Sequence, residues 1–161
     1  MEKIIQLWKS ESNTKYDENV TFLRTLRSDK SWDIKSSKIH TAIFDKTDCL
    51  QCANCCKTTP ALVLKSDAKR IAKHLGIPPK TFIKRYLIED LNGELLLKSV
   101  PCTFLNEDNT CDIYDVRPRA CRQYPHTDQE GFHKRSNMNA KNTLVCPAVF
   151  KIVEQLKLID K

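Results

Sequence analysis

Residues 49–56 read Cys49-Leu50-Gln51-Cys52-Ala53-Asn54-Cys55-Cys56, so four of eight consecutive residues are cysteines. Two overlapping CxxC units allow three thiolates to turn back onto one metal ion or onto one face of a cluster. Cys55 and Cys56 are adjacent, and neighbouring side chains diverge by about 100° on a helix and by about 180° on a strand. One of this pair is therefore expected to serve a second centre or to take a bridging position.

The other four cysteines lie downstream, with eight, nine and 24 residues between them: Cys102, Cys111, Cys121 and Cys146. Eight donors are the number for two four-thiolate sites, or for one cluster and one mononuclear site. We predict that all eight cysteines are metal ligands, with His126 as a weaker substitute donor. The sequence leaves the pairing between the two sets open.

Composition is that of a globular protein, with 161 residues, 40% hydrophobic and 29% charged. The first residues lack the apolar run of a signal peptide, and no stretch approaches the ~18 apolar residues of a membrane span. We therefore expect a cytoplasmic protein without membrane association. Thiols stay reduced in the cytosol, which favours metal or redox chemistry over disulfide bonds.

Several classes of enzyme are excluded by missing motifs. The three glycines stand alone, so the chain has no GxGxxG, no phosphate-binding P-loop and no GxSxG nucleophile elbow. An HExxH zinc-protease motif is also missing. If all eight cysteines bind metal, no thiol is left as a nucleophile. The sequence identifies no catalytic residue, and the question of enzyme activity stays open, with a non-catalytic role favoured.

The formal net charge is +7, from 27 basic and 20 acidic residues, and most of it lies after residue 48. Eight metal-bound thiolates with two divalent ions would reduce this to about +3. We interpret much of the basic excess as an offset for thiolate charge. The basic residues are scattered along the sequence and lack interleaved aromatic residues, which argues against nucleic-acid binding and leaves an unidentified protein as the expected partner.

The pattern of apolar residues predicts a mainly α protein with a metal-stapled, loop-rich cysteine region and at most a few short strands. We expect helices over residues 2–30 and 31–45, a helix capped by Ser66 and ending at His74, a helix from Pro79 to Ile88, and a C-terminal helix that begins at Pro147. The turn signal at residues 92–93 is expected to end the fourth helix rather than to form a hairpin.

Metal is most needed between Pro101 and Cys146, where only 12 of 46 residues are apolar or aromatic. So few apolar side chains cannot easily offset an ordering cost of ~1–2 kcal/mol per residue. A structural zinc contributes ~10–16 kcal/mol in small modules and could order this segment. We accordingly divide the chain into an N-terminal helical segment, 1–45, and a cysteine-cluster domain with a C-terminal helix, 46–161.

The cysteine run, together with three later motifs, resembles the YkgJ-type cysteine-cluster proteins, also described as a CxxCxxCC zinc- or iron-chelating domain. The later motifs are Pro101-Cys102-x-Phe104-Leu105, Cys111-x-Ile113-Tyr114-x-x-Arg117-Pro118-x-x-Cys121-Arg122-x-Tyr124-Pro125, and Cys146-Pro147. The resemblance covers about residues 45–150 and implies metal chelation by the eight cysteines in a bacterial cytosolic protein. Relatives include larger flagellin lysine N-methylases, whose additional length this chain lacks.

Four residues beside the cysteines are expected to surround the metal without binding it. Arg117 and Arg122 flank Cys121 and could donate to thiolate or sulfide; Arg117 could equally pair with Asp112 or Asp115. Tyr114 and Tyr124 are expected to form walls of the site.

Sulfur-only sites suit zinc and iron–sulfur clusters alike, and the sequence favours zinc slightly. The leading hypothesis is therefore a non-catalytic metal-binding module. The alternatives are an iron–sulfur-dependent redox or methyl-transfer enzyme and a zinc-stabilised nucleic-acid-binding module. These differ in measurable ways: a redox couple would mark the first alternative, and salt-dependent binding the second.

Overall fold

The computed structural model describes residues 2–160 and is mainly α-helical, as predicted. Its helices are α1 (Glu2–Thr14), α2 (Tyr16–Thr25), α3 (Ser31–Phe44), α4 (Asn54–Thr58), α5 (Lys65–His74), α6 (Pro79–Tyr86), α7 (Arg119–Gln123), α8 (Ser136–Thr143) and α9 (Pro147–Ile159). Strands β1 (Leu87–Glu89) and β2 (Leu95–Leu97) form one antiparallel pair. Within the described residues, no helix combines the length and the apolar character needed to cross a membrane.

The chain forms two compact units. The helical unit consists of Met1–Cys52 together with Pro125–Lys161, and the central unit is Ala53–Tyr124. The boundary between them falls inside the cysteine run, directly after Cys52. The boundary predicted at residue 45 is of another kind, because it separates an N-terminal helical segment from the part of the sequence that contains the cysteines. That boundary stays a prediction.

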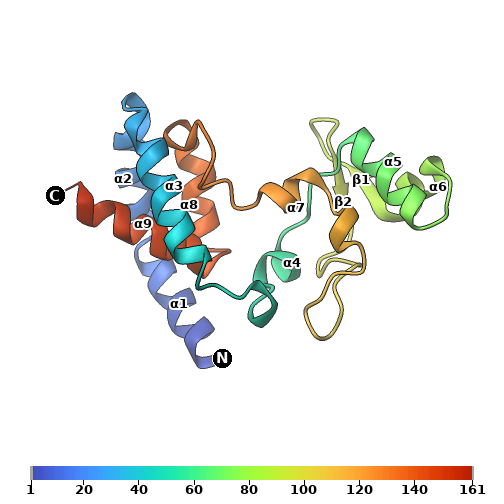
Figure 1. The fold of residues 1–161 in the computed structure, drawn as a ribbon, viewed down its shortest axis with the longest axis horizontal. Helices are drawn as coiled ribbons and strands as arrows, with labels where there is room; N and C mark the ends of the chain where they lie inside the picture. The colour runs from blue at the N-terminus through green and yellow to red at the C-terminus, as the bar shows by residue number, and fades with distance from the viewer. Residues whose placement is uncertain (1, 161) are drawn as a thin grey trace. The chain divides into compact units, whose positions relative to one another are not determined.

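The helical unit is built around α9, which packs against α3, while α2 packs against α8 (Figure 1, α9 in red and α3 in cyan). Four apolar side chains of α9 are fully buried: Val149, Ile152, Val153 and Leu156. Their spacing places them on one helical face. Burying each such side chain stabilises the fold by about 1.5–3 kcal/mol, so this face accounts for much of the unit's stability.

The single helix predicted over residues 2–30 is broken at Lys15, where α1 ends and α2 begins. Tertiary contacts on either side of the break explain it. The indole Nε1 of Trp8 donates to the carbonyl of Thr143 at 3.2 Å, and Lys15 Nζ lies 2.7 Å from Glu154 Oε2. The break lets each helix pack along its own direction, a constraint that local periodicity does not reveal.

A buried, hydrogen-bonded carboxylate joins the start of α3 to the loop before α8. Asp33 accepts hydrogen bonds from the backbone amides of Gly131 (2.7 Å) and His133 (3.0 Å), and lies 2.8 Å from the Nδ1 atom of His133. Burial would raise the pKa of Asp33, but these hydrogen bonds lower it overall. The carboxylate therefore fixes a loop that is 100 residues away in the sequence.

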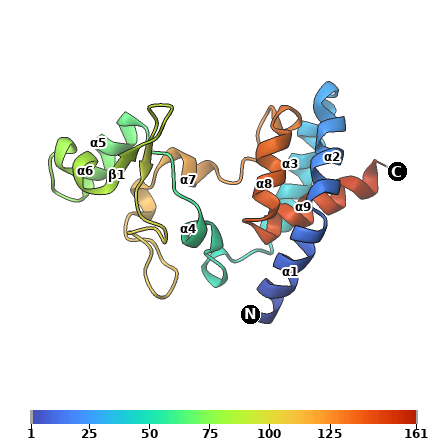
Figure 2. The same ribbon diagram turned by 180° about the vertical axis from the view of Figure 1, so that it is seen from behind.

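The central unit has its own core, in which α5 and α6 lie beside the β1–β2 hairpin (Figure 2). The hairpin pairs Leu87 with Leu97. It corrects the prediction for this segment: α6 ends at Tyr86 rather than at Ile88, and the turn at residues 92–93 joins two strands. Gly93 adopts φ 77°, which glycine supplies without strain.

The start of α5 also differs from the prediction. Leu64, not Ser66, is the N-cap residue, and Asp67 Oδ2 accepts a hydrogen bond from the Leu64 amide at 3.2 Å. An acidic residue in the third helical position can reach back to the cap in this way. Ser66 instead lies exposed within the first turn.

We predict that Asp33→Asn destabilises the protein by about 2 kcal/mol at pH 7, because one or more buried donors then lose their partner. The folded-state pKa of Asp33 is lowered, so its stabilisation is present above about pH 4 and is lost as the pH falls through that folded-state value. Urea unfolding at pH 7 and pH 3 should show a difference that shrinks at pH 3. The exposed Asp45→Asn is the control, and equal losses for both variants would contradict the prediction.

Candidate metal centre

Four cysteines of the central unit come from segments that are distant in the sequence. Cys56 lies on α4 and Cys121 on α7, while Cys102 and Cys111 lie on the irregular segment between β2 and α7. The amide of Cys102 donates to the carbonyl of Cys56 at 2.9 Å, which joins the α4 segment to this later one.

A tight loop brings Cys102 and Cys111 back to the same end of their segment. The amide of Asn106 donates to the carbonyl of Thr110 at 2.9 Å, and Leu105 forms a β-bridge with Cys111. The sequence between the two cysteines therefore folds as a small hairpin-like loop. This loop brings together two cysteines that have eight residues between them in the sequence.

Electrostatics show that these four thiols are neighbours. Burial, together with the charges of Cys56, Cys102 and Cys111, raises the pKa of Cys121 to about 12. Burial likewise raises the pKa of Cys102 and of Cys111, each with an added contribution from Cys56. The thiols of Cys102, Cys111 and Cys121, whose pKa values are raised, become favourable as thiolates only when a cation compensates their charge.

Backbone amides partly offset this effect at two of the cysteines. The amides of Phe104 and Leu105 lower the pKa of Cys102, and the amide of Ile113 lowers that of Cys111. Donation of backbone N–H groups to sulfur is the usual surrounding of a cysteine that binds zinc or an iron–sulfur cluster.

The adjacent pair Cys55 and Cys56 has a different character. The two Sγ atoms lie 3.9 Å apart, and the hydrogen bond from Cys55 lowers the pKa of Cys56 to about 7, assisted by the charge of Lys57. Cys56 is thus close to half deprotonated at neutral pH. Because thiolate is the form that binds metal, Cys56 is the donor of this group that needs least help to ionise.

The helical unit holds three further cysteines. Cys49 opens a short 3₁₀ turn, Cys52 ends it, and Cys146 is the N-cap residue of α9. Burial raises the pKa of Cys146 to about 11, and the charges of Cys49 and Cys52 contribute to this rise. Segments almost a hundred residues apart in sequence are therefore brought into electrostatic contact.

The donor set fits zinc or iron, because both metals accept sulfur-only coordination. The cysteine side chains lie near one another but do not form a preorganised metal site. In the part of the chain that the structure describes, no group of three His, Cys, Asp or Glu side chains is arranged so that it could hold a metal ion. Metal binding would require these thiols to ionise and to draw together. The assignment of the eight cysteines as ligands stays a prediction. The two groups of cysteines described above indicate which of them would share a metal.

Two residues that sequence analysis missed position the segment that carries Cys121. The buried carboxylate of Asp67 accepts hydrogen bonds from Arg70 Nη2 (2.6 Å) and from the amide of Arg119 (3.2 Å), the first residue of α7. Arg70 Nη2 also donates to the carbonyl of Arg117 at 2.9 Å. One carboxylate therefore caps both α5 and α7.

The residues expected around the metal occupy varied positions. The Arg117 guanidinium lies 3.8 Å from the centre of the Tyr114 ring and donates to the Tyr114 carbonyl at 2.6 Å. Its charge lowers the pKa values of Cys111 and Cys121, although burial raises both overall. Tyr114 is 57% exposed. Their roles beside a metal stay predictions.

Three other residues of the sequence prediction are placed as follows. Arg122 is exposed on α7, and Tyr124 is half-buried at the end of the central unit. His126 adopts φ 66° in the helical unit, where its Nδ1 atom lies 3.2 Å from Gln129 Oε1.

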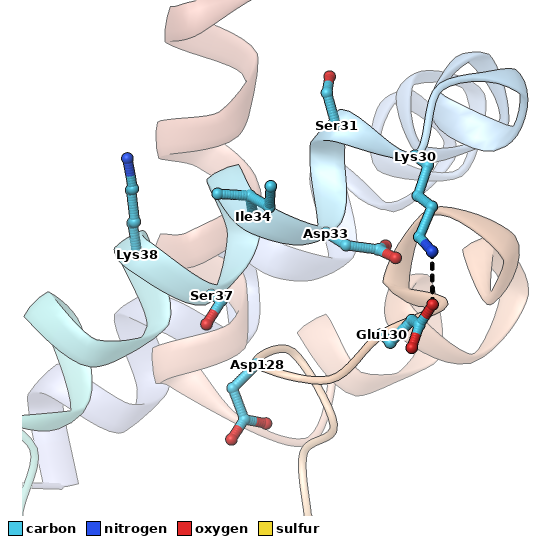
Figure 3. A pocket seen from close by; sticks show the side chains of 8 residues that line it. All are labelled: Lys30, Ser31, Asp33, Ile34, Ser37, Lys38, Asp128 and Glu130. Carbon is cyan, nitrogen blue, oxygen red and sulfur yellow. Dashed lines mark hydrogen bonds and ion pairs between the residues drawn. The ribbon is translucent and has the colours of Figure 1, made fainter.

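A groove of about 580 Å³ on the helical unit is separate from this chemistry (Figure 3). It follows α3 and the loop at residues 128–130, and the exposed ion pair between Lys30 and Glu130 (2.6 Å) lies at one end of it. Its lining contains no cysteine and no histidine. It therefore offers no metal donors of the kind that the cysteine groups provide.

We predict that Cys56 is the first of the central cysteines to react with iodoacetamide in metal-free protein at pH 7. The thiolate is the reacting form, and the pKa values of about 7 for Cys56 and about 12 for Cys121 differ widely. Peptide mass spectrometry during the reaction would give the order of labelling. Cys55→Ser should slow the labelling of Cys56, and equally fast labelling of Cys121 would contradict the assignment.

We predict that Asp67→Ala destabilises the protein by about 3 kcal/mol, because two helix caps and a buried ion pair are lost together. Zinc affinity, measured by competition with a chromophoric chelator, should fall by about tenfold because α7 no longer holds Cys121 in place. Asp115→Ala removes an exposed carboxylate from the same unit and should change neither quantity. If the Asp67→Ala variant folds and its zinc affinity is unchanged, the helix caps that Asp67 forms do not contribute to metal binding.

Comparisons with known proteins agree with this donor set. Residues 48–147 match the family model CxxCxxCC, described as "Putative zinc- or iron-chelating domain". An uncharacterized protein of the archaeon Methanocaldococcus jannaschii is 37% identical over 84 residues, which cover 50% of this chain and 45% of that protein. The chain thus spans less than half the length of this relative, and no solved structure matches it significantly. The family match covers more than half of the chain, and the protein therefore belongs to the CxxCxxCC family of zinc- or iron-chelating domains.

Proposed function

We propose that the protein is a metal-binding module that holds metal through two groups of thiolates. The first group is Cys56, Cys102, Cys111 and Cys121 of the central unit. The second contains Cys49, Cys52 and Cys146 of the helical unit. The observation that supports this proposal best is that backbone contacts join the segments of Cys56, Cys102 and Cys111, whose charges all contribute to the raised pKa of Cys121.

The four central thiolates favour a structural role for the metal, because four protein ligands leave a tetrahedral ion without an open position. When bound, the metal would supply cross-links between α4, the segment between β2 and α7, and α7. That segment runs from Lys98 to Pro118 and contains only the 3₁₀ turn Tyr114–Val116 as regular structure among the described residues. Coordination would therefore order the part of the central unit that its helices and strands do not.

Zinc is the metal that we favour, with an iron–sulfur cluster as the competing occupant. Both use thiolates, and the widely spaced Cys102, Cys111 and Cys121 are readily accommodated by zinc. Metal and acid-labile sulfide analysis of anaerobically purified protein separates the two. Two zinc ions without sulfide would support the proposal as stated, whereas iron with matching sulfide would replace zinc by a cluster.

We predict that single cysteine variants remove one metal at a time. Cys121→Ser should reduce the zinc content from about two ions per chain to about one, because the central site then loses one of its thiolate ligands and the zinc it holds is released more readily. Cys146→Ser should do the same through the second group, and the double variant should lose both ions. Plasma emission spectroscopy after dialysis against a weak chelator gives the numbers.

Two further variants make this experiment specific. His126→Ala removes a histidine that lies outside both groups and should keep the full metal content. Cys55→Ser measures whether Cys55 contributes to either group, since its thiol is adjacent to Cys56. If Cys121→Ser and Cys146→Ser each released all metal, a single shared centre would replace the two groups.

A further inference from the structure

The net positive charge of the chain is concentrated in one helical pair. Residues 65–86, which form α5, its connecting turn and α6, contain seven basic residues and one acidic residue. The remaining residues contain 20 basic and 19 acidic side chains and are thus almost neutral. The basic residues are thus less scattered along the sequence than the expectation against nucleic-acid binding assumed, because the excess falls on the contiguous segment that forms α5 and α6.

Six of these basic side chains are exposed and form what we call the basic surface: Lys65, Lys69, Lys73, Lys80, Lys84 and Arg85. The acidic residue of the pair, Asp67, is buried and bound to Arg70, so no exposed carboxylate of α5 or α6 neutralises the surface. Among the residues that the structure describes, none of the six takes part in an ion pair within the chain.

The basic surface and the central cysteines lie on different elements. The six basic side chains lie on α5 and α6, whereas Cys56, Cys102, Cys111 and Cys121 lie on α4, on α7 and on the segment between β2 and α7. The exposed cations of the basic surface are therefore available to an anionic partner.

The helices are rigidly joined in a helix–turn–helix arrangement. The amides of Ile77 and Gly76 donate to the carbonyls of Ala72 (3.0 Å) and Lys73 (3.2 Å), the pattern of a Schellman motif, with Gly76 at φ 68°. Pro79 then starts α6 in its first turn. Ile71 and Phe82 are fully buried in the shared core, so the outer faces are presented in a fixed geometry.

The spacing of the cations suits a regular polyanion. Lys65, Lys69 and Lys73 recur every four residues along one face of α5, and each step advances about 6 Å along the helix axis. Lys80 and Lys84 repeat the same interval on α6. Duplex DNA presents a phosphate charge every ~1.7 Å of its axis, so several cations can engage phosphates simultaneously.

The exposed residues of the two helices favour nucleic acid over a lipid surface. Besides the basic surface they are Ser66, His74, Pro79 and Thr81, and none is a large apolar side chain. A helix that lies in a membrane interface needs such apolar side chains to insert. In helix–turn–helix proteins the start of the second helix approaches the bases, and here that turn carries Lys80 and Thr81.

We infer that the basic surface on α5 and α6 binds duplex DNA through its phosphates. This interaction is additional to metal binding and does not depend on which metal the cysteines hold. Contacts to phosphate carry no sequence information by themselves, so the surface confers general affinity for duplex DNA.

The test is fluorescence anisotropy of the intact, metal-loaded protein with a labelled 20-base-pair duplex between 50 and 200 mM NaCl. With about six phosphate contacts, affinity should fall by about 10³-fold over this range. The triple variant Lys69→Gln/Lys80→Gln/Lys84→Gln should bind about 100-fold more weakly at 0.1 M salt, with a salt dependence reduced by nearly three contacts. Gln keeps a high helix propensity, and unchanged circular dichroism and metal content would show that the variant is folded.

A second triple variant, Lys38→Gln/Lys46→Gln/Lys141→Gln, removes the same charge from exposed positions of the helical unit and should bind like the unchanged protein. Equal losses in both triple variants would overturn the inference, as would undetectable binding of the unchanged protein at 50 mM salt. Tighter binding to vesicles with 30% phosphatidylserine would assign the surface to lipid instead. Displacement of the duplex by polyglutamate at equal charge concentration would assign it to an acidic protein.

Discussion

The buried carboxylate of Asp67 is the interaction on which the arrangement of the central unit depends. It accepts hydrogen bonds from the amide of Leu64, the N-cap residue of α5, and from the first amide of α7, and it holds the Arg70 guanidinium, which in turn binds the carbonyl of Arg117. Two backbone amides, one guanidinium and one backbone carbonyl are thereby connected through a single buried carboxylate. Because Cys121 lies only two residues beyond Arg119, this network fixes the start of the short helix that carries its thiol.

The two units reach stability by different physical means. The helical unit has a continuous apolar core that includes Leu23, Trp32, Phe132 and the inner face of α9. The central unit has a compact core of its own, but its long segment between β2 and α7 contributes only a few apolar side chains, among them Phe104 and Ile113. In that segment, backbone hydrogen bonds and thiol groups contribute more to the ordering of the chain than apolar packing does. A family defined by its cysteines is consistent with such a unit.

Local sequence signals predicted the elements that depend on local physics. Helices α3 and α9 begin at the expected residues, because Pro147 at the first turn and the apolar spacing that follows are sufficient to specify α9. The break at Lys15 and the hairpin at residues 92–93 depend on what each segment packs against, which a single sequence does not reveal. The cysteines could be recognised as donors from their spacing. Their grouping by unit, and the capping of α7 by Asp67, required the fold.

The helical unit is assembled from the two flanks of the chain, with the central unit between them. Asp33 meets His133 across 100 residues of sequence, and α3 packs against α9 over a similar separation. Contacts between such distant residues form slowly, whereas the central unit is contiguous and relies on shorter separations. During synthesis from the N-terminus, all residues of the central unit emerge before α9 exists, so the helical unit is the last part of the molecule that can close. The order in which the two units mature is thus fixed by the path of the chain.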